Sequence, residues 1–198
     1  MLLPTDDEIR ALHEKHAPTS AAFDLVHTHC EIVCGIAERL LTDGGLEVDA
    51  DLVRAGALLH DIGVYRLYDG DGRIDEAGYI RHGILGYELL KGEGLPDVLC
   101  RFCSCHTGVG ITRDDVQSQE LPLPVADYVA ETPEEELVMY ADKFHSKTDP
   151  PTFVTADSYA ARVRRFGADK VARFRAMCET FGVPDLTSFV AEYGHAPV

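Results

Sequence analysis

The chain has 198 residues, of which 34 are acidic and 18 are lysine or arginine, so its formal net charge at pH 7 is -16. Such an acidic surface repels polyanions, which argues against binding to a nucleic-acid polymer. The length suits one domain with a small appendage. No stretch approaches the roughly 20 apolar residues of a membrane span, and Met1 to Arg10 lacks the basic start and apolar core of a signal peptide. We therefore expect a cytoplasmic protein, away from membranes, whose six cysteines are reduced.

Two helices are predicted in the first part of the chain. One begins at the capping box Thr5-Asp-Asp-Glu8, and its His13 and His16 are expected on the surface because nothing near them requires a ligand. The next helix runs from about residue 20 to 41, with an apolar stripe that contains His29. A lone histidine on an apolar face is more often a hydrogen-bonded core residue than a ligand. His29 therefore becomes a candidate only if partners are found elsewhere.

The third predicted helix is capped by Asp49 and carries Arg54-Ala-Gly-Ala-Leu-Leu-His-Asp-Ile-Gly-Val64, the segment around which the chain is organised. Apolar residues recur there at helical spacing, and Gly63 is expected to end the helix. His60 and Asp61 lie inside this apolar run, where burial of an unpaired carboxylate beside an imidazole is very unfavourable. A divalent cation would compensate both groups, because neutral imidazole and carboxylate are ordinary ligands of transition metals.

Two further helices each contribute a histidine. His82 lies early in a helix predicted over residues 77–91. In that helix Gly83 and Gly86 are each unfavourable by about 1 kcal/mol relative to alanine, which indicates close approach of another backbone. His106 ends the next helix, which has Pro96 in its first turn.

The pattern Cys100-x-x-Cys103-x-Cys105 allows two interpretations. It could form a zinc or redox site, or it could supply small apolar side chains to the helix that follows Pro96. A structural zinc site needs a second ligand pair of this kind, which the sequence lacks. We therefore favour the apolar interpretation.

The last candidate ligand is Asp142, and the composition of the chain changes in the C-terminal quarter that follows it. A short capped helix is expected over residues 112–119, and a longer one begins at Thr132-Pro-Glu-Glu135 and brings Asp142 to its inner side. A buried aspartate without a partner is rare, so Asp142 also indicates a cation.

After a stiff linker, helices are expected over 156–166, 168–181 and 185–193. No clear strand pattern is present, so the predicted fold is all-α, with one domain over 1–146 and a helical extension over 147–198.

The candidate ligands come from several helices, which is how helical bundles build metal sites. They are His29, His60, Asp61, His82, His106 and Asp142. In these residues the sequence resembles the HD-domain superfamily of metal-dependent phosphohydrolases. The resemblance covers residues 20–146 and rests on His29, Ala57-Leu-Leu-His-Asp-Ile-Gly63, His82-Gly-Ile-Leu-Gly86, His106-Thr-Gly108 and Ala141-Asp142-Lys143. The stretch from His106 to Glu136 is also similar to an uncharacterised archaeal and bacterial subfamily.

The resemblance implies a centre of two divalent transition metals. In similar members four residues hold the first metal and two hold the second, and the residue that matches Asp61 bridges them. The corresponding residues here are His29, His60, Asp61 and Asp142 for the first metal and His82 and His106 for the second. Members with one metal lack the two middle histidines, which this chain has. Histidine-rich ligation favours iron or manganese, with zinc or nickel as alternatives, over magnesium.

One departure from the family pattern concerns phosphate binding. Many members carry a lysine directly after the glycine of the HDIG motif, where this chain has Val64. The expected phosphate contact is therefore missing at that position, and Arg66 or Lys143 could replace it.

The resemblance implies hydrolysis of a phosphoester or phosphoanhydride bond in a small nucleotide-like substrate. A hydroxide formed from water shared by two ions about 3.5 to 4 Å apart would attack phosphorus in line. The predicted catalytic residues are Asp61, Lys143 and His145, although His145 could instead cap its helix. Two rival functions suit the same ligands: a mixed-valent di-iron oxygenase that cleaves C–C or C–P bonds, and a regulatory module that keeps the metal for structure.

The C-terminal quarter has alternative roles. Pro150-Pro151 limits the direction of the chain, so the segment is expected to fold back near the site. Arg162 or Arg165 would then reach a bound phosphate. Four apolar residues would be buried against the core: Phe153, Tyr159, Val163 and Phe166. Alternatively, the segment is an independent appendage or mediates a homodimer.

Overall fold

The structure, a computed structural model, describes residues 3–198, so Met1 and Leu2, with which the predicted first domain begins, lie outside it. Helices make up nearly all of the regular structure in this range, which confirms the all-α class. None of them is both long enough and apolar enough to cross a membrane. The α-helices are α1 (Asp6–His16), α2 (Ser20–Gly44), α3 (Ala50–Leu59), α4 (His82–Gly92), α5 (Asp97–Cys105), α6 (Arg113–Ser118), α7 (Pro133–Ala141), α8 (Ala156–Val163), α9 (Ala168–Phe181) and α10 (Thr187–Tyr193). The 3-10 helices are η1 (Ile62–Leu67), η2 (Tyr79–Arg81), η3 (Asp142–Phe144) and η4 (Arg164–Phe166).

The local sequence determines where several helices begin. Thr5 and Thr112 each form a capping box, in which the hydroxyl accepts a hydrogen bond from the backbone N–H three residues on, and the carboxylate at that position accepts one from the threonine N–H. Asp49 caps α3, and Thr132 caps α7, whose first residue is a proline. These starts confirm the predictions. Pro96 differs slightly, because it lies just before α5 as its N-cap.

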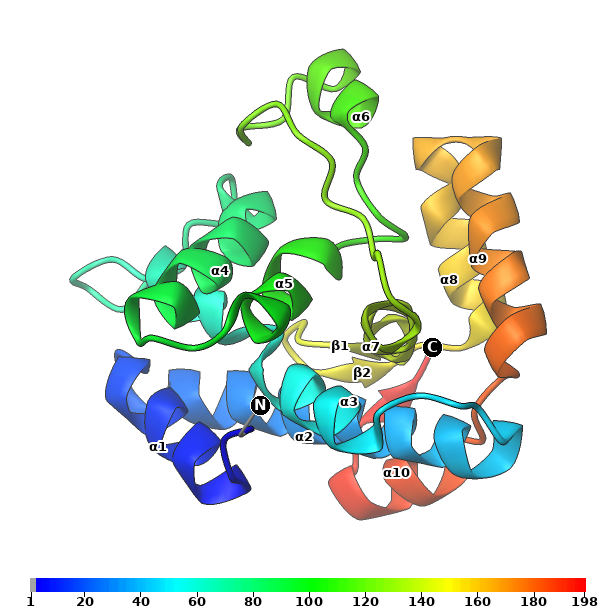
Figure 1. The fold of residues 1–198 in the computed structure, drawn as a ribbon, viewed down its shortest axis with the longest axis horizontal. Helices are drawn as coiled ribbons and strands as arrows, with labels where there is room; N and C mark the ends of the chain where they lie inside the picture. The colour runs from blue at the N-terminus through cyan, green and yellow to red at the C-terminus, as the bar shows by residue number, and fades with distance from the viewer. Residues whose placement is uncertain (1–2) are drawn as a thin grey trace.

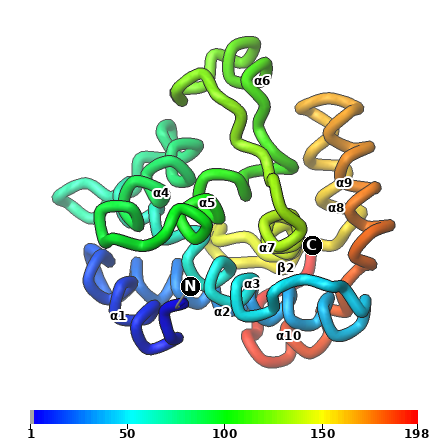
Figure 2. The backbone as a smooth tube through the Cα atoms, in the orientation of Figure 1, coloured from blue at the N-terminus to red at the C-terminus, as the bar shows by residue number. Residues whose placement is uncertain are grey.

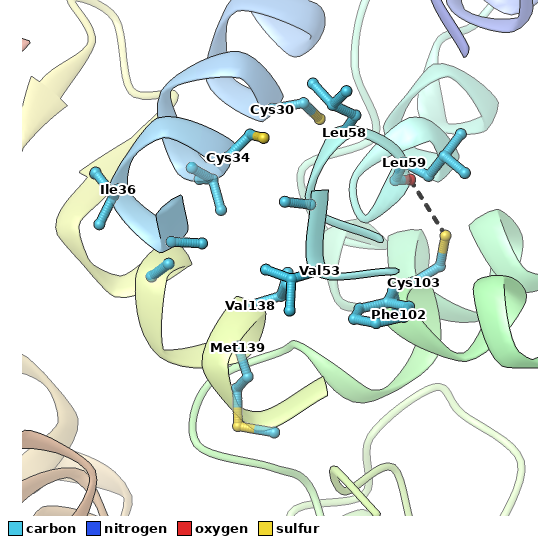
Figure 3. Packing of buried hydrophobic residues seen from close by; sticks show 14 of the residues in the cluster. Cys30, Cys34, Ile36, Val53, Leu58, Leu59, Phe102, Cys103, Val138 and Met139 are labelled. Carbon is cyan, nitrogen blue, oxygen red and sulfur yellow. Dashed lines mark hydrogen bonds between the residues drawn. The ribbon is translucent and has the colours of Figure 1, made fainter. Parts of the chain in front are cut away.

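The long helix α2 packs against α3 and α7, while α5 packs against α3, and α4 against α5 and η1 (Figure 1). The main core lies where α2, α3, α5 and α7 meet. Figure 3 shows this region, in which Cys34, Val53, Phe102 and Val138 are buried. Apolar faces from four helices therefore surround the place where α3 ends.

The cysteines of α5 belong to this core. Cys100, Cys103 and Cys105 are buried, and burial raises the pKa of all three thiols. The Cys103 thiol donates to the Leu59 carbonyl over 3.3 Å (Figure 3). A thiol with a raised pKa is a poor nucleophile and a poor metal ligand. The apolar interpretation of the cysteine pattern therefore agrees with the structure.

Three glycines allow η1, α4 and α5 to approach closely. A Cβ on Gly63 would lie 2.1 Å from the His82 carbonyl oxygen, and one on Gly83 would lie 2.7 Å from the Cys103 carbonyl oxygen. A Cβ on Gly86 would lie 2.9 Å from the Cys103 side chain. The prediction of a close approach at Gly83 and Gly86 is thus confirmed. The prediction that Gly63 ends α3 is wrong, because α3 ends earlier and Gly63 lies inside η1, against α4.

The structure also contains a small three-stranded sheet (Figure 1), whose first strand contacts α2, and the sequence does not predict it. β1 (His145–Ser146) pairs antiparallel with β2 (Thr152–Phe153), and β2 pairs in parallel with β3 (Ala196–Pro197). Strands of two residues carry too few side chains for an alternating pattern to show. The sheet brings the residues around position 195 next to the segment that follows α7.

The helices α8 and α9 form a hairpin at one side of the molecule (Figure 2). Phe153 and Val163 are buried as predicted, and Tyr159 is half-buried. The prediction for Phe166 is wrong: it is 47% exposed, because it lies in η4 at the turn of the hairpin. Side chains of α9 also join the main core cluster, so the C-terminal quarter packs against the rest of the protein.

The two histidines of α1 differ from their prediction as surface residues. His13 is fully buried, with Nδ1 2.9 Å from the Tyr65 hydroxyl and Nε2 2.8 Å from the Leu58 carbonyl oxygen. His16 is half-buried and lies 2.9 Å from Glu93. These partners are distant in sequence, so no local pattern around α1 could reveal them.

Candidate metal centre

The adjacent pair His60 and Asp61 lies where α3 ends and η1 begins. Nearly every residue of the last two turns of α3 is buried, so the helix delivers the pair into the core. The exposed fraction is 0% for His60 and 1% for Asp61. A carboxylate removed so completely from water needs a compensating positive charge.

The other four predicted ligands reach the same place from other helices. His29 lies on the buried face of α2, and His82 is the first residue of α4. His106 and Asp142 directly follow α5 and α7. The structure therefore brings together all six residues that the sequence indicates.

The first cluster consists of His29, His60, Asp61 and Asp142. His29 Nε2 lies 3.0 Å from Asp142 Oδ1, 3.2 Å from Asp61 Oδ2 and 3.3 Å from His60 Nε2. His60 Nε2 lies 3.6 Å from each of these two carboxylate oxygens. Four donor atoms thus surround one position.

The second cluster consists of Asp61, His82 and His106. The two Nε2 atoms lie 3.0 Å apart, and each lies 3.5 Å from Asp61 Oδ1. Asp61 therefore presents Oδ2 to the first cluster and Oδ1 to the second. Within residues 3–198, Asp61 Oδ1 is the one buried side-chain nitrogen or oxygen that lacks a hydrogen-bond partner.

Hydrogen bonds to the backbone fix the orientation of three imidazole rings. Each Nδ1 donates to a carbonyl oxygen: His60 to Ala57 over 2.7 Å, His82 to Tyr79 over 2.6 Å and His106 to Phe102 over 3.0 Å. Because a carbonyl oxygen can only accept, Nδ1 of each ring carries a proton, and Nε2 is the nitrogen that faces the clusters and offers its lone pair when the ring is neutral. Burial lowers the pKa of His82 to about 4 and also lowers the pKa of His106, so both rings are neutral at pH 7.

These features fit metal ions better than hydrogen bonds. Two Nε2 lone pairs 3.0 Å apart repel each other, and a buried carboxylate oxygen without a donor is unfavourable. A cation between these atoms would remove both problems. For a ligand distance of about 2.1 Å, neighbouring ligand atoms lie about 3.0 Å apart in an octahedral site and about 3.4 Å apart in a tetrahedral one, close to the separations found here. Imidazole with carboxylate suits iron, manganese and zinc.

Behind the first cluster, three histidines form a chain of hydrogen bonds. His29 Nδ1 lies 2.8 Å from His145 Nδ1, and His145 Nε2 lies 2.9 Å from His195 Nδ1. His29 can offer its Nε2 lone pair to a metal only if its Nδ1 carries the proton and donates to His145. Burial lowers the pKa of His145 to about 2, so this ring stays neutral and can accept that bond. His145 thus uses both of its ring nitrogens within the chain.

Two lysines neutralise the aspartates of the site. Lys143 Nζ donates to Asp142 Oδ2 over 2.7 Å and to the His106 carbonyl oxygen over 2.9 Å. Lys147 Nζ contacts Asp61 Oδ2. Burial raises the pKa of both carboxyl groups, but the charge of Lys147 holds the pKa of Asp61 well below its ordinary value, and Lys143 does the same for Asp142. Both aspartates are therefore ionised.

The clusters border a cavity of about 910 Å³. Lys143 and Lys147 line it beside the clusters, and Arg162 and Arg165 line it from α8 and η4. Arg66 is the exposed residue of η1 and does not belong to the lining, so the structure does not bring it to the site. Three of the four predicted substrate-binding residues thus border the cavity.

Lys147 and His195 are not among the residues predicted for the site. Both positions depend on the small sheet, since Lys147 directly follows β1 and His195 directly precedes β3. A usable signal does exist in Lys143-Phe-His-Ser-Lys147, where three basic side chains alternate directly after Asp142. Three alternating residues are too few to indicate a strand in a chain whose other segments have helical patterns.

A model of the HD domain family matches residues 26–147. Among similar proteins, a tRNA (cytidine(56)-2'-O)-methyltransferase of Picrophilus torridus is 41% identical over 125 residues, which are 63% of this chain and 33% of that protein. An uncharacterized protein of Methanocaldococcus jannaschii is 38% identical over 117 residues, 58% of this chain and 62% of that protein. A tRNA (cytidine(56)-2'-O)-methyltransferase of Thermoplasma volcanium is 28% identical over 180 residues, 90% of this chain and 48% of that protein. This chain thus spans less than two thirds of the length of each of these relatives.

Solved structures share the fold. The HD domain of the phosphodiesterase PgpH of L. monocytogenes matches with a TM-score of 0.53 and 15% identity, over 94% of this chain and 99% of that chain. The same domain in complex with cyclic-di-AMP matches with a TM-score of 0.53 and 16% identity, over 93% and 96% of the two chains. At this identity the likeness shows a common helical architecture.

Proposed function

This chain belongs to the HD domain family, and from that membership we propose that it is a metal-dependent phosphohydrolase. Its substrate would be a small nucleotide-like molecule, in which it cleaves a phosphoester or phosphoanhydride bond. The observation that carries the proposal is a pair of clusters that share Asp61 and border a cavity lined by lysine and arginine. Paired metal sites joined by one carboxylate suit phosphoryl transfer.

Charge at the site favours an anionic substrate. Two divalent ions would bring four positive charges, against two negative charges from Asp61 and Asp142. Lysine and arginine side chains add positive charge around the cavity. The chain as a whole carries a net charge of -16, so the cavity would be a positive region on an acidic protein. This distribution favours a small phosphate compound over a long polyanion.

Each cluster would hold one metal ion, with Asp61 contributing an oxygen to both. When bound, the ions would lower the pKa of water and neutralise charge on the phosphoryl oxygens. Iron or manganese suits these ligands best, with zinc or nickel as alternatives. The contribution of the chain is to orient the imidazoles, to keep His82 and His106 neutral, and to keep both aspartates ionised.

Three cationic side chains are proposed to bind the substrate. Lys143 holds Asp142 and also lines the cavity, so it can donate to a phosphoryl oxygen. Arg162 and Arg165 would bind the part of the substrate farther from the clusters. His145 is better placed to orient His29 than to transfer a proton, because both of its ring nitrogens are engaged.

The relatives guide the choice of substrates to test. Two of them are named as tRNA methyltransferases, but this chain spans only 33% and 48% of those proteins, so their activity is not transferred to it. The HD domain of PgpH has been solved with cyclic-di-AMP. Cyclic dinucleotides therefore belong in the first panel, beside nucleoside mono-, di- and triphosphates.

The test measures product release by metal-loaded protein across this panel. We expect one class of nucleotide to be hydrolysed with Mn²⁺ or Fe²⁺, and the activity to be lost in Asp61→Ala. His27→Ala is the matched control, because His27 is a buried histidine of α2 that lies outside both clusters. Loaded protein that hydrolyses none of these compounds would count against the proposal.

The same assay separates the rival functions. A di-iron oxygenase requires iron and O₂, so its activity would be absent with Mn²⁺ and under anaerobic conditions, whereas hydrolysis needs no O₂. A regulatory module would bind metal and turn over nothing. Metal content, O₂ consumption and product release, measured on one preparation, therefore distinguish all three.

A further inference from the structure

Lys147 lies in the loop between β1 and β2 and extends its side chain to the clusters. Its Nζ contacts Asp61 Oδ2, and the side chains of Lys147 and Asp61 are 11% and 1% exposed. Burial of a lysine is unfavourable unless its charge is paired, and here the pairing is with a carboxylate that also needs a cation. The two residues therefore satisfy each other in this structure.

The oxygen that Lys147 contacts is the one that faces the first cluster. Asp61 Oδ2 lies 3.2 Å from His29 Nε2 and 3.6 Å from His60 Nε2. Asp61 Oδ1, which faces the second cluster, lacks a hydrogen-bond partner. The ammonium group thus supplies positive charge beside the first cluster, where a metal ion would supply it. A divalent ion in the first cluster would repel this ammonium at close range, so the two cations compete for one oxygen.

The cavity offers space for a Lys147 side chain displaced from Asp61. Tyr79 and Asp142 also act on the Lys147 ammonium, and Asp142 is already paired with Lys143. Lys147 itself lines the cavity, together with the next two residues of its loop. Rotation away from Asp61 therefore leaves the ammonium beside the space where a phosphate would bind.

We propose that Lys147 is an internal counter-ion that competes with the first metal ion for Asp61 and that, once displaced, binds the phosphate group of the substrate. The inference rests on the proposed metal centre and extends it to a residue outside the two clusters. Lys147 thus pairs with the Asp61 carboxylate before metal binds and with the phosphate of the substrate afterwards.

Titration of metal-free protein with Mn²⁺ tests the competition. One Mn²⁺ should bind Lys147→Met about tenfold more tightly than the wild type, or ~1.4 kcal/mol, because binding no longer breaks an ion pair. Lys147→Arg keeps the charge and should resemble the wild type. In thermal unfolding, metal-free Lys147→Met should melt below the wild type, and Mn²⁺ should raise its Tm by more. If Lys147→Met does not fold, Lys147→Gln gives the same readout.

Lys170→Met is the matched control for this titration. Lys170 contacts Asp115, and the two side chains are 12% and 16% exposed, so this pair is nearly as buried as the one at the site. It joins α9 to α6 and lies outside both clusters. Lys170→Met should lose stability but bind Mn²⁺ with wild-type affinity.

Inorganic phosphate tests the second role on Mn²⁺-loaded protein. Phosphate should bind Lys147→Met about tenfold more weakly than the wild type, since one charge-assisted hydrogen bond is lost. Equal Mn²⁺ affinities of Lys147→Met and wild type would overturn the competition, and equal phosphate affinities would overturn the second role. If the wild type bound no Mn²⁺ at all, the proposed function would fail. Failure of the competition alone would instead appear as Mn²⁺ binding that is equally tight in the wild type and in Lys147→Met.

Discussion

Asp61 faces both clusters, and this position should make it the least replaceable residue of the site. Asp61→Ala removes the oxygens that face His29 and His82 and leaves the Lys147 ammonium without its partner. We expect both metals to be lost, because each cluster loses a ligand and the negative charge between them disappears. Elemental analysis of loaded, desalted protein measures this directly. A variant that retained two metals per chain would contradict the bridging role.

The second cluster should be separable from the first. His82 and His106 belong to the second cluster alone, so replacing either with alanine should remove one metal and leave the other. His27→Ala serves as control, since it removes a buried imidazole without touching either cluster. Metal counts of one, one and two per chain are the expected result. Loss of both metals, or of neither, from the first two variants would show that the two sites are not independent.

His13 gives folding stability a pH dependence that is separate from the clusters. Burial lowers its pKa from 6.5 to about 4. Between these values the unfolded chain binds a proton that the folded chain does not. The stability that neutral His13 contributes is therefore complete above pH 6.5 and is lost as the pH falls toward 4. The loss is about 3 kcal/mol for a shift of this size. In urea unfolding, His13→Gln should therefore have a lower free energy of unfolding than the wild type at pH 7, and the difference should shrink toward pH 4.5. A difference that stays constant with pH would contradict this.

Among the contacts between helices, that of η1 with α4 should tolerate a methyl group least. A Cβ on Gly63 would lie 2.1 Å from the His82 carbonyl oxygen and 2.3 Å from the Gly86 nitrogen, and backbone atoms cannot rotate away. We expect Gly63→Ala to lower the free energy of unfolding by about 3 kcal/mol and to weaken the second metal site, since α4 begins with His82. Gly92→Ala, where a Cβ would meet open space, should leave both unchanged. Urea unfolding and metal analysis measure the two effects.

The helices could be predicted because their signals are local. The caps at Thr5, Asp49 and Thr132 depend on residues within one turn, and the structure reproduces them. The three short strands could not be predicted, because their pairing joins positions near 145, 152 and 196 and leaves no periodicity. Gly63 illustrates an ambiguity: a glycine near a helix end can terminate the helix or allow a close contact, and sequence alone does not distinguish the two.

The C-terminal quarter packs into the core of the protein, so its role is better tested by point substitutions than by deletion. Phe153 and side chains of α9 belong to the main core, so we expect truncation after Ser146 to destabilise the whole protein. Arg162→Ala and Arg165→Ala should instead raise KM for an anionic substrate about tenfold, with little change in Tm. Arg164→Ala is the control, because Arg164 is exposed in the same turn but does not line the cavity. Equal KM values for all three would exclude the α8–η4 turn from substrate binding.

The six candidate ligands could be predicted because buried acids and imidazoles are conspicuous among apolar residues. His195 could not, since its role depends on the sheet, and Lys147 has only the short local signal of alternating basic residues after Asp142. His195 lies 50 positions from His145, with which it pairs. The same long-range packing engages both ring nitrogens of His145, which supports the proposal that it orients His29, although its sequence position also suits a catalytic residue. A homodimer, a cytoplasmic location and the exclusion of nucleic-acid polymers stay predictions.

The wide spacing of the ligands along the chain has a consequence for the life of the protein in a cell. His29 and Asp142 are 113 positions apart and meet in the first cluster, so an ion held by both would act as a removable cross-link across most of the fold. A covalent link closing a loop of about 100 residues stabilises a protein by about 5 kcal/mol in the chain-entropy model. An ion does so only while it is supplied, because its contribution follows its free concentration. Starvation for metal would then shorten the survival of the molecule against proteases, in addition to silencing its chemistry.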